Sequence, residues 1–243
     1  YNDAAGNAGQ AASSAPLSYD TLAPTTGAAI TSASDDVGVL QGPVAEAGST
    51  DDATPTLSGT LTASLNGGDR LRVFRSGALL GEAMVDNSAK TWTLTPSTGL
   101  EDGLHHFSVA VADAVGNLGP ISTSRTLTVD TLAPSLVISS DKSELVAGET
   151  ATITFTFTED PGTSFSWDGA AGDLIISGGT VSPLSGSDAW HRTATFTPIA
   201  DSQGTALISV LAGSYNDAAG NLGAADSFSS LVFDTRLPPT PPM

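Results

Sequence analysis

The sequence has no cysteine and few basic residues, and both absences limit what the chain can do. Without cysteine there are no disulfides and no thiolate metal sites, so stability must come from packing or from oxygen-ligated metal ions. Eight lysines and arginines are outnumbered by 26 aspartates and glutamates, which gives a formal net charge of -18. This charge repels nucleic acid and anionic membrane surfaces, so we expect neither as a partner and expect cations instead.

Long apolar runs and catalytic signatures are missing as well. No run reaches the roughly 18 apolar residues of a membrane-spanning helix, so we expect no direct membrane insertion. The first residues lack the basic and then apolar pattern of a signal peptide, and we expect any export signal to lie outside this sequence. The chain has no Gly-x-Ser-x-Gly, His-Glu-x-x-His or phosphate-binding glycine loop, so we do not expect an enzyme.

A short motif, Asp-Ala-x-Gly-Asn, is present three times, and an aspartate at the start of a proline-containing linker always follows seventeen residues after it begins. The paired aspartates are Asp3 with Asp20, Asp113 with Asp130, and Asp217 with Asp234. The copies recur roughly every 100 residues, which is the size of an immunoglobulin-like sandwich. The sequence therefore predicts an all-β fold of tandem immunoglobulin-like β-sandwich domains in a linear rod.

The linkers set the expected domain boundaries. Residues 1–23 match the last loop and strand of a preceding repeat, 24–133 form a first sandwich, 134–236 a second, and 237–243 a Pro-rich linker or tail. Neighbouring repeats of the same chain are therefore expected partners. Because one strand cannot bury a face alone, we also expect residues 1–20 to pair with a sheet edge of this or a neighbouring chain.

Short alternating runs separated by Gly, Asn, Asp and Pro predict strands in both domains. Within residues 152–158, threonines alternate with Ile153, Phe155 and Phe157, which predicts a half-buried strand. The expected strands of the first domain are 29–32, 56–62, 71–76, 79–85, 91–95, 104–111 and 122–129. Those of the second are 136–139, 152–158, 174–177, 193–197, 206–211 and 228–233.

The acidic residues are expected to gather at the ends of the sandwiches, because the chain enters such a domain at one end and leaves it at the other. The central junction should combine Asp35, Asp36, Asp51, Asp52, Asp102, Asp130, Glu159, Asp160, Asp168 and Asp217. The first junction should combine Asp20, Asp69, Asp113 and Asn117, and the far end carries Asp141, Glu144, Asp201 and Asp234.

Carboxylate and amide oxygens are the ligands of Ca²⁺, which takes six to eight of them in proteins. A carboxylate cluster repels itself without a cation, whereas a bound ion makes the cluster favourable and ties two domains to their linker. Calcium ions at the junctions are therefore the expected cofactor. The alternative is that Asp, Asn and Gly are simply good turn residues and that acidic loops keep a surface protein soluble.

Two sets of segments carry a family resemblance: residues 35–38, 50–59, 113–117 and 130–131 in one repeat variant, and 140–149, 155–159, 196–198 and 215–221 in another. Through these segments the chain resembles the bacterial immunoglobulin-like repeats of giant RTX-type adhesins exported by type I secretion. The resemblance implies a secreted or cell-surface extender that binds calcium at its junctions, is anchored in the outer membrane through other parts, and projects a ligand-binding tip for adhesion or biofilm formation. One departure is Arg236, where the other linkers have Leu22 and Leu132.

A carbohydrate- or protein-binding module is the other function that the sequence leaves open. Trp167 and Trp190 lie near loops of the second domain, and exposed aromatic rings stack on sugars. An open groove lined by both would favour such a binder, whereas a spacer predicts polar threonine faces and no pocket. His105 and His106 begin a strand, and strand alternation explains them better than a zinc or catalytic pair does.

Overall fold

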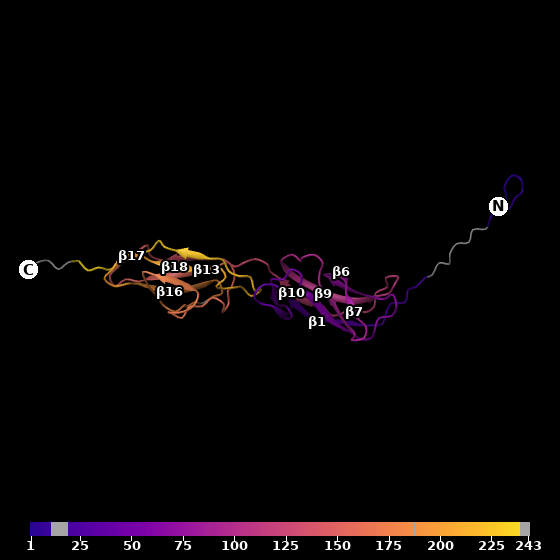
Figure 1. Ribbon diagram of the computed structural model, residues 1–243, viewed down its shortest axis with the longest axis horizontal. Helices are drawn as coiled ribbons and strands as arrows, with labels where there is room; N and C mark the ends of the chain where they lie inside the picture. Colours follow the sequence, from indigo (N-terminus) through magenta and orange to yellow (C-terminus); the bar gives the residue numbers. More distant parts are fainter. Residues whose placement is uncertain (11–18, 187, 239–243) are drawn as a thin grey trace, which may run out of the picture.

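The computed structural model of the chain describes residues 1–10, 19–186 and 188–238. Strands are the only regular secondary structure in these ranges, which confirms the all-β prediction. Two sandwiches follow one another in a line (Figure 1). Within the described ranges, no helix has the length and apolarity that crossing a bilayer requires.

The first sandwich consists of two five-stranded sheets. One has the order β2 (Gly42–Val44), β1 (Ala28–Asp35), β4 (Thr56–Leu61), β8 (Thr91–Leu94), β7 (Met84–Asp86). The other has the order β3 (Ser49–Thr50), β10 (Arg125–Val129), β9 (Gly103–Ala112), β5 (Arg70–Arg75), β6 (Ala78–Glu82). Neighbours are antiparallel except for β3 and β10, which run parallel.

The second sandwich repeats this plan with its second sheet in two sections. One sheet has the order β11 (Leu136–Ser140), β13 (Ala151–Phe157), β16 (His191–Pro198), β15 (Gly179–Val181). The sections opposite are β12 (Glu144–Val146), β20 (Val232–Asp234), β17 (Gln203–Thr205) and β14 (Leu174–Ser177), β18 (Leu207–Val210), β19 (Asp226–Phe228). Again one pair, β12 with β20, is parallel.

Each sandwich has its own hydrophobic core, one within residues 33–129 and the other within 136–233. Strand β13 has the expected alternation, because Ile153, Phe155 and Phe157 are at most 3% exposed while Thr152 and Thr156 face solvent. In the first core, Trp92 is buried and its indole N–H donates to the carbonyl of Ala29 (3.1 Å). The two cores share no residue, and the linker 130–134 runs between them.

The structure adds five short strands that were not expected, β2, β3, β12, β15 and β17, and divides two of the expected ones. Residues 79–85 form not one strand but two, because β6 pairs with β5 in one sheet whereas β7 pairs with β8 in the other. The chain changes sheet at Ala83, whose N–H donates to the carbonyl of Leu71. The expected strand 228–233 is likewise interrupted, and Leu231 in the gap between β19 and β20 is fully buried.

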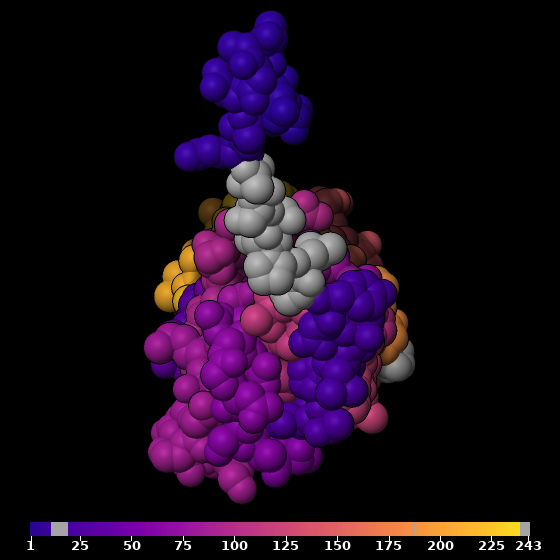
Figure 2. All heavy atoms as spheres, turned by 90° about the vertical axis from the view of Figure 1, so that its right-hand side faces the viewer, coloured from indigo at the N-terminus to yellow at the C-terminus, as the bar shows by residue number. Residues whose placement is uncertain are grey.

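The first ten residues stand clear of the first sandwich (Figure 2). They form a turn of their own, closed by a bridge between Asn2 and Ala8, with the ring of Tyr1 against Gly9. The expected pairing of residues 1–20 with a sheet edge falls partly on 11–18, outside the described residues, and it stays a prediction. The Pro-rich tail is described only to Pro238.

Separate cores make a first prediction about stability. Replacing Phe155 by alanine should lower the free energy of unfolding of the second sandwich by about 3–5 kcal/mol through the cavity it leaves. The first sandwich should be unaffected. Chemical denaturation followed by fluorescence separates the two, because Trp92 reports the first domain while Trp167 and Trp190 report the second.

Thr156→Ala, on the exposed face of the same strand, is the matched control and should change stability by no more than about 0.5 kcal/mol. A shift of the Trp92 transition in Phe155→Ala would contradict independent cores.

Candidate metal centre at the domain junction

The repeated motif is a turn that its own aspartate closes. In the last copy, Asp217 Oδ1 accepts the backbone N–H groups of Ala219, Gly220 and Asn221 at 2.8–3.0 Å. Asn221 Nδ2 donates to Asp217 Oδ2 (2.9 Å). Gly220 has a φ of 108°, which only glycine adopts without strain. The copies at Asp113 and Asp3 make the corresponding turns.

The asparagine of the motif also holds the linker that enters its domain. Asn221 Nδ2 donates to the backbone carbonyl of Asp130 (2.7 Å), and Asn117 Nδ2 donates to that of Asp20 (3.1 Å). Each contact joins the turn at the end of a domain to the linker at its beginning. Turn chemistry therefore accounts for the motif and for its asparagine, and a metal argument must come from the carboxylates.

Tyr215 reinforces the same contact and was missed by the sequence reasoning. Its hydroxyl lies 3.3 Å from the carbonyl of Pro134 in the linker and 3.2 Å from that of Ala224. Burial raises the pKa of this phenol to about 12, with a contribution from the charge of Asp226. Tyr1 precedes the first motif at the same spacing, and this recurrence was the available signal.

Three carboxylates meet where the linker joins the second domain. Oxygens of Asp130, Glu159 and Asp217 all lie within 4.8 Å of one another. Asp217 is 5% exposed, and the other two are half-buried. Burial raises the pKa of the Glu159 carboxyl, and the charges of Asp130 and Asp217 raise it further.

Two more carboxylates reach this junction from the first domain. Asp35 is buried and accepts a hydrogen bond from Thr50 Oγ1 (2.5 Å). Asp51 donates its backbone N–H across the junction to the carbonyl of Ala219 (3.2 Å). Burial, then the neighbouring Asp35, and then the charge of Asp217 raise the pKa of Asp51.

The Asp51 carboxylate is packed between glycines of both domains. A Cβ on Gly38 of the first domain would lie 2.0 Å from Asp51 Oδ2, and one on Gly220 of the second would lie 3.4 Å from it. Among the described atoms, Asp51 Oδ1 is buried and has no hydrogen-bond partner. The lone pairs of this oxygen are therefore available to a cation.

Other expected ligands of the central junction have different partners. Asp52 is buried and accepts from the backbone and hydroxyl of Thr54. Asp102 accepts both the N–H and the hydroxyl of Thr131 in the linker (3.0 Å each), and its charge also raises the pKa of Glu159. It is thus near the three carboxylates.

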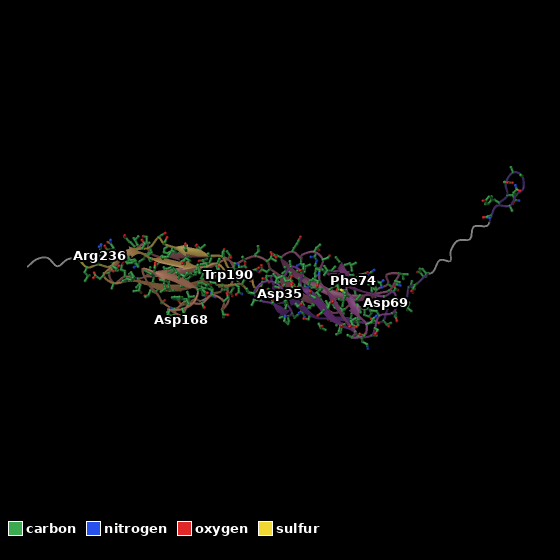
Figure 3. All side chains as sticks on the ribbon, in the orientation of Figure 1. Asp35, Asp69, Phe74, Asp168, Trp190 and Arg236 are labelled. Atoms are coloured by element: carbon green, nitrogen blue, oxygen red, sulfur yellow. The ribbon has the colours of Figure 1, made fainter. Side chains whose placement is uncertain are left out.

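Of the remaining acids, Asp36 is exposed, and Asp160 pairs with Arg192 (3.5 Å). Asp168 is not brought to the cluster: it accepts the N–H groups of Ala170 and Ala171 in its own turn, on the flank of the second sandwich (Figure 3). Its loop begins at the junction but carries Asp168 away from it.

The acids of the two outer linkers do not gather as those of the central linker do. In the part of the chain that the structure describes, one group of three acidic residues has the spacing of metal ligands, and it consists of Asp130, Glu159 and Asp217. Asp20 is exposed, and Asp69 accepts from the backbone of Asn66 in its own loop. Asp234 is paired with Arg236, whose guanidinium holds the pKa of that carboxyl at about 2.

The tryptophans and histidines differ in their exposure. Trp167 packs against the second core and its indole N–H donates to the carbonyl of Val181 (3.2 Å). Trp190 is 50% exposed. His105 is buried with a ring nitrogen bonded to the carbonyl of Glu101, whereas His106 faces solvent. Trp190 is therefore the more exposed of the two rings, and the sugar-binding alternative stays a prediction.

Comparison with known families agrees with the two sandwiches. Residues 25–131 match one family model described as a bacterial Ig-like domain, and residues 130–232 match a second with the same description. No curated protein matches the chain.

Three similar solved structures have low sequence identity to this chain and low TM-scores. Fibronectin(III)-like modules of Clostridium thermocellum CbhA are 14% identical, with 86% of this chain and 94% of that chain covered and a TM-score of 0.31. Bacteroides ovatus SGBP-B, solved with a mixed-linkage heptasaccharide, is 17% identical (86% and 47% covered, TM-score 0.27). A 1.5-MDa bacterial ice-binding adhesin is 20% identical (88% and 66% covered, TM-score 0.40).

The Asn221 contact makes a second prediction. Asn221→Ala should leave the Asp130 carbonyl unpaired, cost about 1 kcal/mol, and increase bending at the junction. Scattering of the purified protein measures the bending, and thermal unfolding measures the cost. Asn117→Ala is the matched control, because it frees residues 19–24 and should leave the central junction unchanged. Equal bending in both variants would contradict this role for Asn221.

A third prediction concerns pH in the presence of a chelator. Because the folded-state pKa of Asp51 is raised above 3.8, its ionisation destabilises the folded protein as the pH rises through that raised value. Asp51→Asn should therefore melt higher than the wild type at pH 7, and the difference should vanish at pH 3. Asp36→Asn, an exposed neighbour, should show no such trend. A wild type that melts higher than Asp51→Asn at pH 7 would contradict the raised pKa.

Proposed function

Because the chain consists of two tandem bacterial Ig-like domains, we propose that it is an extender segment of a bacterial surface adhesin, stiffened by Ca²⁺ at the domain junction. Ig-like domains are typically structural modules rather than enzymes. The linear arrangement of the sandwiches suits a spacer, because each one adds length to the chain without folding back on the other (Figure 1).

One observation carries the proposal: carboxylates from both domains and from the linker converge. Asp51 comes from the first domain, Asp130 from the linker, and Glu159 and Asp217 from the second domain. Their mutual repulsion opposes the folded junction, since burial and neighbouring charge both raise the pKa values of Asp51 and Glu159. A divalent cation bound among these carboxylates would replace their net repulsion by attraction to the ion.

Calcium fits the donor set better than a softer metal. Every candidate ligand is an oxygen, and the chain has no cysteine. Ca²⁺ tolerates irregular geometry and completes six to eight ligands with backbone carbonyls and water, which suits a site assembled from two domains and their linker. Bending of the junction would then have to break metal-ligand bonds, so the ion would restrict it.

The finer parts of the proposal come from the family resemblance. We propose that the protein is secreted by the type I route as an RTX-type giant adhesin, reaches the bacterial cell surface and is anchored in the outer membrane through other parts. These repeats would hold a ligand-binding tip away from the cell for adhesion or biofilm formation. Pairing of residues 1–20 with a sheet edge is retained as a prediction.

Calcium should stabilise and straighten the protein together. At a free concentration about 100 times the dissociation constant, it should add about 2.7 kcal/mol to the free energy of unfolding. Thermal unfolding measures this effect, and small-angle scattering measures the maximum dimension and flexibility with and without chelator. Asp130→Asn should lose most of both responses.

Asp168→Asn is the matched control, because this acid closes its own turn on the flank of the second sandwich and should leave the calcium responses intact. Magnesium at equal ionic strength controls for screening. If wild type and Asp130→Asn respond to calcium alike, the ion does not bind at the central junction.

A further inference from the structure

The three linkers share one backbone turn but differ in the side chain that completes it. In each, the N–H two residues after the linker aspartate donates to that aspartate's Oδ1. The pairs are Leu22 with Asp20 (3.0 Å), Leu132 with Asp130 (3.2 Å) and Arg236 with Asp234 (3.2 Å). The turn places the third linker residue next to the carboxylate, so the identity of that residue decides what the carboxylate meets.

In the last linker the carboxylate meets a guanidinium. Arg236 donates from Nε to Asp234 Oδ1 (2.9 Å) and from Nη2 to Asp234 Oδ2 (2.7 Å). This two-pronged pairing covers both oxygens, a geometry that arginine makes and lysine does not. Asp201 also attracts the same guanidinium. The positive charge at this end of the second domain is thus supplied by the chain.

In the central linker the side chain of the corresponding residue has no hydrogen-bond donor. Leu132 is 62% exposed and offers only its backbone N–H to Asp130. The Asp130 carboxylate instead lies beside Glu159 and Asp217, within 4.8 Å. The same turn therefore leaves one linker aspartate facing other acids and gives the other an arginine.

The threonine between the linker aspartate and this residue also has different partners in the two linkers. Thr131 donates its hydroxyl to the carboxylate of Asp102, which adds a charge to the central junction. Thr235 donates its hydroxyl to neutral acceptors, the carbonyls of Ile199 (2.6 Å) and Ser202 (3.0 Å). The last linker thus lacks an acid bound to its threonine and has an arginine that the central linker lacks.

We propose that the residue two positions after the linker aspartate selects the cation of each junction. Leu132 leaves Asp130 open to a divalent metal ion, whereas Arg236 is a built-in cation that takes the place of the ion at Asp234. This inference rests on the proposed calcium site at the central junction. It adds that joints of the two kinds differ in their dependence on external calcium.

The test transfers the arginine to the central linker. In the two-domain chain, Leu132→Arg should pair with Asp130 as Arg236 pairs with Asp234 and weaken calcium binding by about tenfold, which is about 1.4 kcal/mol. Calorimetric titration with CaCl₂ measures the affinity. Leu132→Arg should also raise the melting temperature in chelator, since the guanidinium offsets part of the repulsion. Position 132 is exposed, so the core is not disturbed.

Two further variants keep the result decisive. Leu132→Gln, polar but uncharged, should bind calcium within about twofold of the wild type, because it adds no charge. Leu132→Lys, with a single point charge, should fall between glutamine and arginine, and it replaces the arginine variant if that one does not fold.

The outcomes separate the two proposals. If the wild type binds no calcium, the proposed function fails and this inference falls with it. If the wild type binds calcium and Leu132→Arg binds it equally well, the inference is wrong while the proposed function stands. An equal loss in Leu132→Gln and Leu132→Arg would assign the effect to the missing leucine and also overturn the inference. Loss with the charged residues alone supports it.

Discussion

The hydrogen bond from Asn221 to the carbonyl of Asp130 is the contact on which the junction depends. It fixes the linker against the second domain, and Tyr215 holds the same linker further along the chain, at Pro134. With the linker fixed, the Asp130 side chain has to lie beside Asp217, which the same asparagine orients. A single amide group thus positions both the chain path and two of the clustered acids.

Close approach of the two domains then creates an electrostatic conflict. The backbone hydrogen bond from Asp51 to Ala219 and the close approach of Gly220 to Leu40 bring the first domain against the turn of the second. This packing buries carboxylates that water would otherwise solvate. Burial of like charges is costly unless a counter-charge is present. The last linker contains such a counter-charge in Arg236, whereas the central one does not.

The sequence was sufficient for the fold class: the alternation in residues 152–158 predicts a half-buried strand, and the spacing of the motif predicts domains of the size of a sandwich. The site was less accessible. Asp35, Asp51 and Asp217 could be assigned to the central junction from loop order. Nothing local distinguishes them from Asp168, whose carboxylate accepts hydrogen bonds from the backbone of its own turn. Gly38 and Thr50, which shape the Asp51 and Asp35 sites, have roles visible only in the folded first domain.

The parallel pairs β3 with β10 and β12 with β20 have a mechanical consequence. In each domain an early strand lies beside the last one and parallel to it. A force along the rod therefore pulls the early strand from its N-terminal end and the last strand from its C-terminal end. Such a load shears the hydrogen bonds of the pair together, instead of opening them one by one from an end. With separate cores in series, an overloaded rod would yield one sandwich at a time, and each yielding domain would release slack that protects its neighbour from rupture.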